Sequence, residues 1–213
     1  MNRLPVRPFI SGITNRINRL AMVLAVAVVA ALCIMGCSSH IIDEPHVPAQ
    51  SRISGAETLA VAVDISSSRG NAAETQIGEF GRRDIVLASA YEDWIADGLI
   101  SEYRRAGFDA GRGSVTGSGA AQVRVEVEQL FGEGVSNCKL ILECVGASAV
   151  FDVELTDPRT GNRYGRRFVG TSSSESMSLD VEDLEDEIRR ALTKTFAEIV
   201  DETHALLTAA SSN

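Results

Sequence analysis

Two segments in the second half of the chain alternate between apolar and charged residues, and this pattern constrains the fold more than any other feature. Three valines alternate with three charged residues in 122–131, and four apolar residues alternate with two acids in 148–155. Because side chains of a strand point alternately to its two faces, each segment predicts a strand with one buried and one solvated face, which is typical of an antiparallel sheet. The charged set, expected on the solvated face, is Arg124, Glu126, Glu128, Asp152 and Glu154.

The rest of the chain supplies further strands and two helices. Strands are expected at 57–65 and 163–171, the second joined to 148–155 by a turn containing Pro158 and Gly161. Apolar residues at helical spacing predict helices over 85–106, with Asp84 as N-cap, and over 180–207. The sequence therefore predicts an α+β fold: a mostly antiparallel sheet of four to five strands with two long helices packed on one face.

The first 36 residues have the composition of a secretory signal peptide. Residues 1–20 contain four arginines and no acid, and residues 21–36 contain no charge. Sixteen uncharged residues are fewer than the about 20 that span a bilayer as a helix, and the basic flank stays on the cytoplasmic side. We therefore expect residues 1–36 to be removed and Ser38 onward to be exported.

The end of this segment, Ile34-Met35-Gly36-Cys37, resembles the bacterial lipobox. We expect Cys37 to receive a lipid and to become the first residue of the mature protein. The alternative is an uncleaved anchor with a coincidental cysteine. Serine rather than aspartate after Cys37 favours the outer membrane over the inner membrane.

Cleavage before Cys37 would leave 177 of the 213 residues, which suits a single domain. Without the four signal arginines, 16 basic residues face 29 acidic ones, so the net charge is −13. Such a surface repels nucleic acids and anionic lipid headgroups, and we expect neither as a partner.

Residues 37–55 are expected to form the lipidated cysteine and a flexible tether before a domain at 56–210. The stretch after Cys37 is polar, contains two prolines and lacks periodicity. It carries His40 and His46, but a mobile tether cannot preorganise metal ligands, so both histidines are expected to be solvated.

Cys138 and Cys144 remain for pairing in an oxidising compartment. In one straight strand their Cα atoms would be about 20 Å apart, far beyond the about 7 Å that a disulfide allows. Either residues 137–145 fold back as a small closed loop or the two thiols stay apart. The compartment favours the bridge.

No set of catalytic residues emerges from the sequence. Two of the three histidines lie in the expected tether, which excludes a convincing Ser-His-Asp arrangement. The acids that begin the second helix complement its dipole. We therefore expect no enzyme activity, no metal site and no small-molecule cofactor.

The order of elements and several short motifs resemble the YajG-like outer-membrane lipoproteins. The similar motifs, which together with the lipobox cover most of the mature chain, are Val-Asp-Ile-Ser-Ser-Ser-Arg at 63–69, Ile77-Gly78, Arg105-Ala106-Gly107-Phe108, Val127-Glu128-Gln129-Leu130-Phe131 and residues 164–170. The pair Cys138 and Cys144 departs from that pattern. The resemblance implies an envelope address and this fold, but no catalytic residue.

These observations favour a lipid-anchored, periplasm-facing interaction module that binds an envelope protein or the cell wall. The alternative is an auxiliary or structural subunit of an envelope transport or secretion machine. An exposed apolar patch on a sheet edge or a helix would favour the alternative.

Overall fold

The computed structural model describes residues 38–42, 46–67, 76–80, 83–87, 91–113, 119–139 and 142–209. The predicted signal segment and Cys37 lie outside these residues, so their proposed roles stay predictions.

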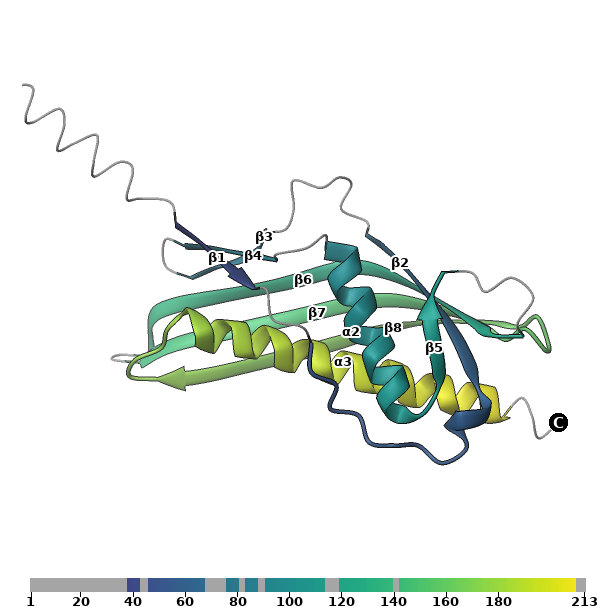
Figure 1. Ribbon diagram of the computed structural model, residues 1–213. Coiled ribbons are helices and arrows are strands. Elements are labelled where there is room, and N and C mark those ends of the chain that lie inside the picture. The colour runs from purple at the N-terminus through teal and green to yellow at the C-terminus, as the bar shows by residue number, and fades with distance from the viewer. Residues whose placement is uncertain are drawn as a thin grey trace, which may run out of the picture. The chain divides into compact units, whose positions relative to one another are not determined.

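One long strand, β6 (Ala121–Lys139), organises the sheet (Figure 1). β7 (Leu142–Thr156) pairs with it antiparallel along nearly its whole length, and β8 (Arg163–Ser176) pairs antiparallel with β7. These three strands carry the alternating pattern, and the alternation places one face of the ribbon against the core.

Two smaller groups of strands share the other edge of β6. β2 (Ala60–Ser67) runs parallel to its first half and is extended by β5 (Asp109–Arg112), also parallel. β3 (Gln76–Phe80) runs parallel to its second half, and β4 (Arg83–Leu87) and β1 (Ser38–Ile42) follow. The described strands therefore form one mixed, eight-stranded sheet.

The predicted four- to five-stranded, mostly antiparallel sheet is wrong. The class α+β holds, but the connection that leads from β2 to β6 contains the helix α2 (Tyr91–Ala106). Such a crossover connection makes the two strands parallel. The strands β1, β3 and β4 were missed because they are five residues long and lie in segments assigned to a tether, a loop and a helix.

The helix predicted over 85–106 begins only at Tyr91. Ile85 and Leu87 are buried on either side of the half-buried Val86, which is the period of a strand, and they belong to β4. Asp84 is consequently a strand residue and not the N-cap. The second helix, α3 (Val181–Ala209), matches its prediction closely.

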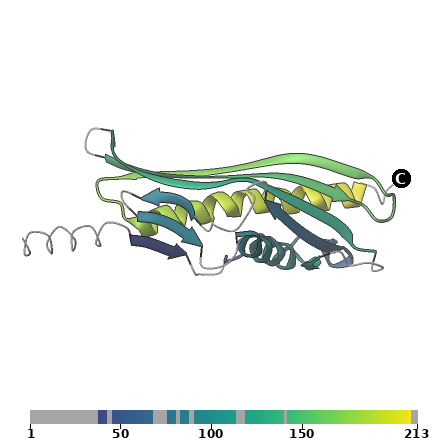
Figure 2. The same cartoon turned by 90° about the horizontal axis from the view of Figure 1, so that it is seen from above.

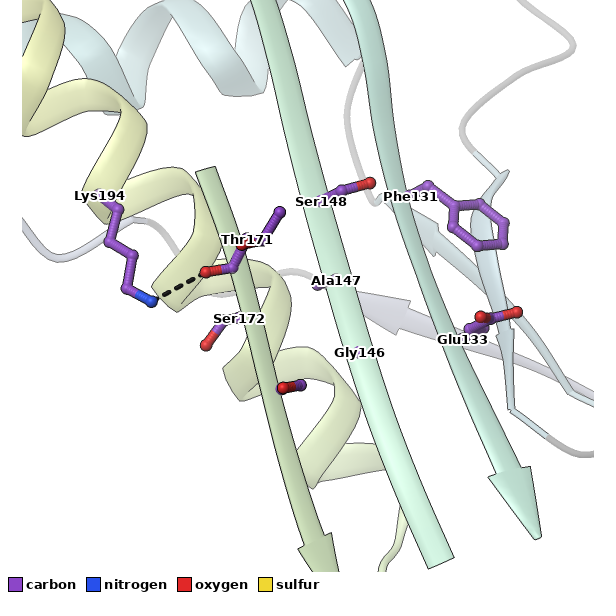
Figure 3. A pocket seen from close by; sticks show the side chains of 9 residues that line it. Phe131, Glu133, Gly146, Ala147, Ser148, Thr171, Ser172 and Lys194 are labelled. Atoms are coloured by element: carbon purple, nitrogen blue, oxygen red, sulfur yellow. Dashed lines mark hydrogen bonds between the residues drawn. The ribbon is translucent and has the colours of Figure 1, made fainter. Parts of the chain in front are cut away.

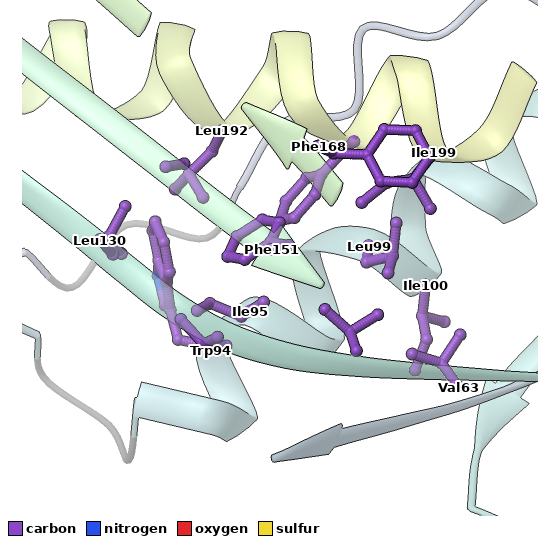
Figure 4. Close-up of a cluster of buried hydrophobic side chains, with 14 of the residues drawn as sticks. Val63, Trp94, Ile95, Leu99, Ile100, Leu130, Phe151, Phe168, Leu192 and Ile199 are labelled. Atoms are coloured by element: carbon purple, nitrogen blue, oxygen red, sulfur yellow. The ribbon is translucent and has the colours of Figure 1, made fainter. Parts of the chain in front are cut away.

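Both long helices lie on one side of the sheet (Figure 2), as expected. α3 packs against β6, β7 and β8, and α2 packs against β2 and β5. Figure 4 shows aromatic and aliphatic side chains from helices and strands meeting between the two layers. At the centre, the rings of Phe151 and Phe196 stack with centroids 5.9 Å apart, and the Tyr103 hydroxyl bonds the Thr203 hydroxyl at 2.7 Å.

Glycine on β8 allows α3 to approach the sheet closely. A Cβ atom at Gly170 would lie 2.1 Å from Thr195 Oγ1 and 2.2 Å from the carbonyl oxygen of Ala191, so there is no space for a side chain. At Gly165, on the same strand, a Cβ atom would meet nothing within 4 Å.

Gly170→Ala is therefore expected to push α3 away from β8 and to lower the free energy of unfolding by about 2 kcal/mol or more. Gly165→Ala is the matched control and should change it by less than about 0.5 kcal/mol. Urea denaturation of both variants measures the difference, and equal midpoints would contradict this packing.

The segment expected to be a flexible tether is packed on the domain wherever the structure describes it. β1 belongs to the sheet, and the amide of Ile53 donates to the carbonyl oxygen of Ala106 at 2.8 Å. His46 is buried, whereas it was expected in solvent: its ring meets the edge of Phe196, with centroids 5.2 Å apart. His40 is half-buried and bonds Glu185 at 2.9 Å.

The side chain of Glu102, on α2, fixes this segment in place. Its two oxygens accept hydrogen bonds from His46 Nε2 at 2.7 Å and from the amides of Ala49 and Gln50 at 3.0 and 2.9 Å. The side chains of Glu102 and His46 are 0% and 2% exposed. Burial alone would raise the pKa of Glu102, but these hydrogen bonds outweigh it and hold the pKa below its usual value.

Replacing Glu102 by glutamine should lower the free energy of unfolding at pH 7 by about 2 kcal/mol, because the three donors lose a charged acceptor. A carboxylate whose pKa is lowered by folding stabilises above its unfolded pKa of about 4.3, and this contribution is lost as the pH falls through the folded value. The difference between wild type and Glu102→Gln should therefore shrink at pH 3.

The exposed Glu198, on α3, provides the control, since Glu198→Gln should change the free energy of unfolding by less than about 0.5 kcal/mol at either pH. A Glu102→Gln effect that is the same at pH 7 and pH 3 would contradict the ionised state of Glu102.

Candidate interaction face

The face of β6, β7 and β8 that points away from the helices, called the outer face here, carries the predicted charged set. All five residues are exposed or half-buried and lie on that face. The prediction of a solvated charged face is confirmed: Arg124, Glu126, Glu128, Asp152 and Glu154.

Charges on the outer face are paired across strands. Arg167 donates to both carboxylate oxygens of Asp152, at 2.8 and 2.6 Å, and this bonding lowers the pKa of Asp152. Arg167 also lies 3.7 Å from Glu128, and Arg124 lies 3.7 Å from Asp64 on β2. Exposed pairs of this kind contribute little to stability, so we attribute to them mainly the pattern of charge that a partner would meet.

A β-bulge in β6 changes which residues face outward. Val127 pairs with Phe151 and Gln129 with Val150, so Glu128 is an extra residue in the ladder. Before it, the odd-numbered residues of β6 are buried; after it, Leu130 is buried and Phe131 is turned to solvent. The bulge therefore places on the outer face a phenylalanine that uninterrupted alternation would bury.

Phe131, Val150 and Val169 form an apolar stripe across the outer face. Val150 pairs directly with Val169 on β8, and Phe131 lies diagonally beside Val150 on β6. Phe131 is 37% exposed and Val169 is 52% exposed. An apolar row bordered by charge, on a sheet face that neither described long helix covers, is the kind of surface that binds other molecules.

A shallow groove of about 530 Å³ lies beside the stripe (Figure 3). Gly146 and Ser148 form its floor on β7 and Thr171 lines it on β8, while Ala147 between them turns its side chain into the core. Lys194 reaches from α3 to the Thr171 carbonyl oxygen at 2.8 Å. Small side chains on the floor leave space for side chains of a second molecule to enter.

A disulfide closes the end of the β6–β7 ribbon. Cys138 and Cys144 are bonded, with Cα atoms 5.9 Å apart. Lys139 pairs with Leu142, so the chain turns back between the cysteines, as the closed-loop alternative requires. The predicted bridge is present.

The described residues contain no cluster suited to a metal ion. No three of their His, Cys, Asp and Glu side chains are placed to hold a metal ion. Within the same part of the chain, no helix is long and apolar enough to cross a bilayer.

No family model matches the sequence, and no curated protein matches it. Solved structures do match. Protein XCC0632 from Xanthomonas campestris, of the family model DUF330, aligns with a TM-score of 0.59 and 15% identity over 82% of this chain and 100% of its own. An uncharacterized protein aligns with a TM-score of 0.52 and 12% identity over 78% of this chain and 99% of its own.

A minor lipoprotein from Acinetobacter baumannii matches with a TM-score of 0.39 and 11% identity over 68% of this chain and 90% of its own, which is too distant to support an inference. The first two similarities establish a shared fold only. None of these three structures is described as YajG-like, so that resemblance stays a prediction.

The sequence contained a signal for the bulge, although the prediction did not use it. Glu128 and Gln129 are adjacent polar residues that interrupt the alternation, and Leu130 and Phe131 follow as an adjacent apolar pair. A polar pair followed by an apolar pair cannot fit a regular alternation, so the residues after it must exchange the faces to which odd and even positions point.

Deleting Glu128 should therefore be far less damaging than deleting Glu126, which has a partner in the ladder. Without the extra residue the alternation of β6 becomes continuous, with Leu130 still in the core and Phe131 still on the outer face, and we expect the free energy of unfolding to change by less than about 1 kcal/mol. Deleting Glu126 would place Val127 on the outer face and Glu128 in the core, and should cost about 3 kcal/mol or more. Thermal denaturation compares the two deletions, and similar losses would contradict the role of the bulge.

Proposed function

We propose that the protein is a lipid-anchored, periplasm-facing interaction module of a bacterial envelope, and that its outer face binds an envelope protein or the cell wall. The observation that carries this proposal is the apolar stripe of Phe131, Val150 and Val169, of which the first and last are exposed, on a sheet face that neither of the two long described helices covers. A purely structural face needs no bulge to turn a phenylalanine outward.

The anchor is proposed from the sequence. A basic flank, a short uncharged core and a lipobox-like Ile34-Met35-Gly36-Cys37 support lipidation of Cys37, and Ser38 supports the outer membrane. Because β1 begins at Ser38, a lipid on Cys37 would sit at the start of the folded domain and not at the end of a long tether. Such an anchor would hold the domain close to the membrane surface.

The same stripe favours a second candidate, an auxiliary or structural subunit of an envelope transport or secretion machine. Residues of such subunits bury apolar surface in permanent contacts, which tend to be more apolar than transient ones. The two candidates differ in lifetime: a subunit should remain bound to its machine through purification, and a transient module should be recovered only after crosslinking. No catalysis is proposed in either case.

The anchor is tested by Cys37→Ser. We expect the variant protein to keep its fold and to appear in the soluble fraction after lysis, whereas wild type sediments with the membranes. Circular dichroism checks the fold, and immunoblotting of the fractions checks the location. A Cys37→Ser protein that stays in the membrane fraction would overturn lipid anchoring.

The binding face is tested by a photo-crosslinking amino acid placed singly at Val150, on the stripe, and at Glu198, exposed on α3, in intact cells. We expect a specific crosslinked band from position 150 and none from position 198. Phe131→Ser should remove the band while leaving the melting temperature within a few degrees of wild type. Equal crosslinking from both positions would refute a binding role for the outer face.

A further inference from the structure

The outer edge of β8 is a long strand edge beside which no other described strand lies. Among the described strands, β8 pairs with β7 alone, over fourteen residue pairs from Thr156–Arg163 to Glu143–Ser176. Strand edges of this length are templates for pairing with another chain, and proteins usually shorten, cover or charge them. On β8, α3 covers the inner face but provides no partner strand.

The hydrogen bond from Lys194 identifies which residues of β8 direct their backbone groups outward. Lys194 Nζ donates to the carbonyl oxygen of Thr171 from the side away from β7 (Figure 3). Because residues of an antiparallel strand direct their backbone groups alternately to its two neighbours, the odd-numbered residues of β8 present theirs at the open edge. Lysine on an edge is also a common guard against pairing, and this one occupies a single carbonyl group.

Charges on β8 are arranged so that the strand complements itself. Its first half contains Arg163, Arg166 and Arg167, and its second half contains one charged residue, Glu175. Val169 lies midway between Arg163 and Glu175, six residues from each. An antiparallel pairing of two copies with Val169 opposite Val169 therefore places Arg163 of each copy opposite the partner's Glu175.

We propose that β8 pairs antiparallel with β8 of a second copy of this chain, about a twofold axis at Val169. The interface is isologous, so each contact occurs twice, and the two sheets become one continuous sheet. Backbone bonds from the odd-numbered residues form the ladder, and two Arg163–Glu175 pairs set its register. Shifting the strands by two residues in either direction places Arg163 or Glu175 opposite an uncharged residue. A shift by four residues would pair Glu175 with Arg167, but Arg167 already donates to both carboxylate oxygens of Asp152, at 2.8 and 2.6 Å. Arg163 is held less closely, 3.9 Å from Glu154, so the register about Val169 is favoured.

This dimer leaves the outer face accessible and doubles it. Side chains of the odd-numbered residues of β8 point to that face, so Val169 of each copy would extend the apolar stripe across the axis. The proposal does not depend on the lipid anchor or on the nature of the partner, since it uses only the edge of β8.

Cysteine crosslinking tests the register in the full-length protein in intact cells. In a hydrogen-bonded antiparallel pair the Cα atoms lie about 5.5 Å apart, within the range of a disulfide, so Val169→Cys should form a covalent dimer under mild oxidation. Gly165→Cys is the matched control on the same face, because its two copies would lie about 27 Å apart. Co-expressed Gly165→Cys and Ser173→Cys chains should crosslink, since these positions are opposite each other.

The unsubstituted chain reports any linking through native cysteines. A Val169→Cys protein that stays monomeric, a Gly165→Cys protein that dimerises equally well, or a Val169→Cys product with the mass of a different protein would each overturn the proposal. The last outcome would mean that the edge accepts a strand from another chain.

Charge exchange provides the second test, by sedimentation equilibrium of the purified full-length protein in detergent. Arg163→Glu and Glu175→Arg should each weaken self-association by about tenfold, because each places two like-charged pairs across the axis. Combining both changes in one chain, or mixing the two single variants, should restore it. Single changes without effect, or a double variant as weak as the singles, would contradict the register.

Discussion

The structure depends on the use of both edges of β6. A strand of nineteen residues is long enough to hold the β7–β8 ribbon along one edge and two separate parallel strands, β2 and β3, along the other. Both long helices, α2 and α3, pack on the sheet face where the valines of β6 are buried, so they cover only that face of the sheet. The opposite face of the three longest strands is left open, and the proposed function rests on that face.

Much of this was predictable where a single rule applied over many residues. The charged outer face followed from strict alternation in β6 and β7, and α3 from its regular apolar spacing. The short strands β1, β3 and β4 could not be predicted, because they have too few residues to display a period and depend on neighbours far away in the sequence. The bulge at Glu128 is intermediate: the local pattern breaks there, but only the partner strand shows which residue is extra.

The N-terminal segment illustrates how a polar sequence can conceal a packed element. His46 lies among prolines and charges, and nothing near it in the chain predicts burial. The compensating acid, Glu102, is 56 residues away on the buried side of α2, where a carboxylate would be costly without its three donors. The sequence alone does not predict that His46 and Glu102 are in contact, yet together they fix the segment that follows the proposed lipid anchor.

The central claim is that the bulge at Glu128 turns Phe131 of β6 outward, where it completes the apolar stripe with Val150 and Val169. Reaction of a water-soluble maleimide with single cysteines along this strand tests it most directly. We predict a change of phase, with strong labelling at even positions before the bulge and at odd positions after it, and slow labelling elsewhere. The reactive positions should be 124, 126, 131, 133 and 135, and the protected ones 123, 125, 127 and 130. Labelling at position 130 with protection at 131 would contradict the account.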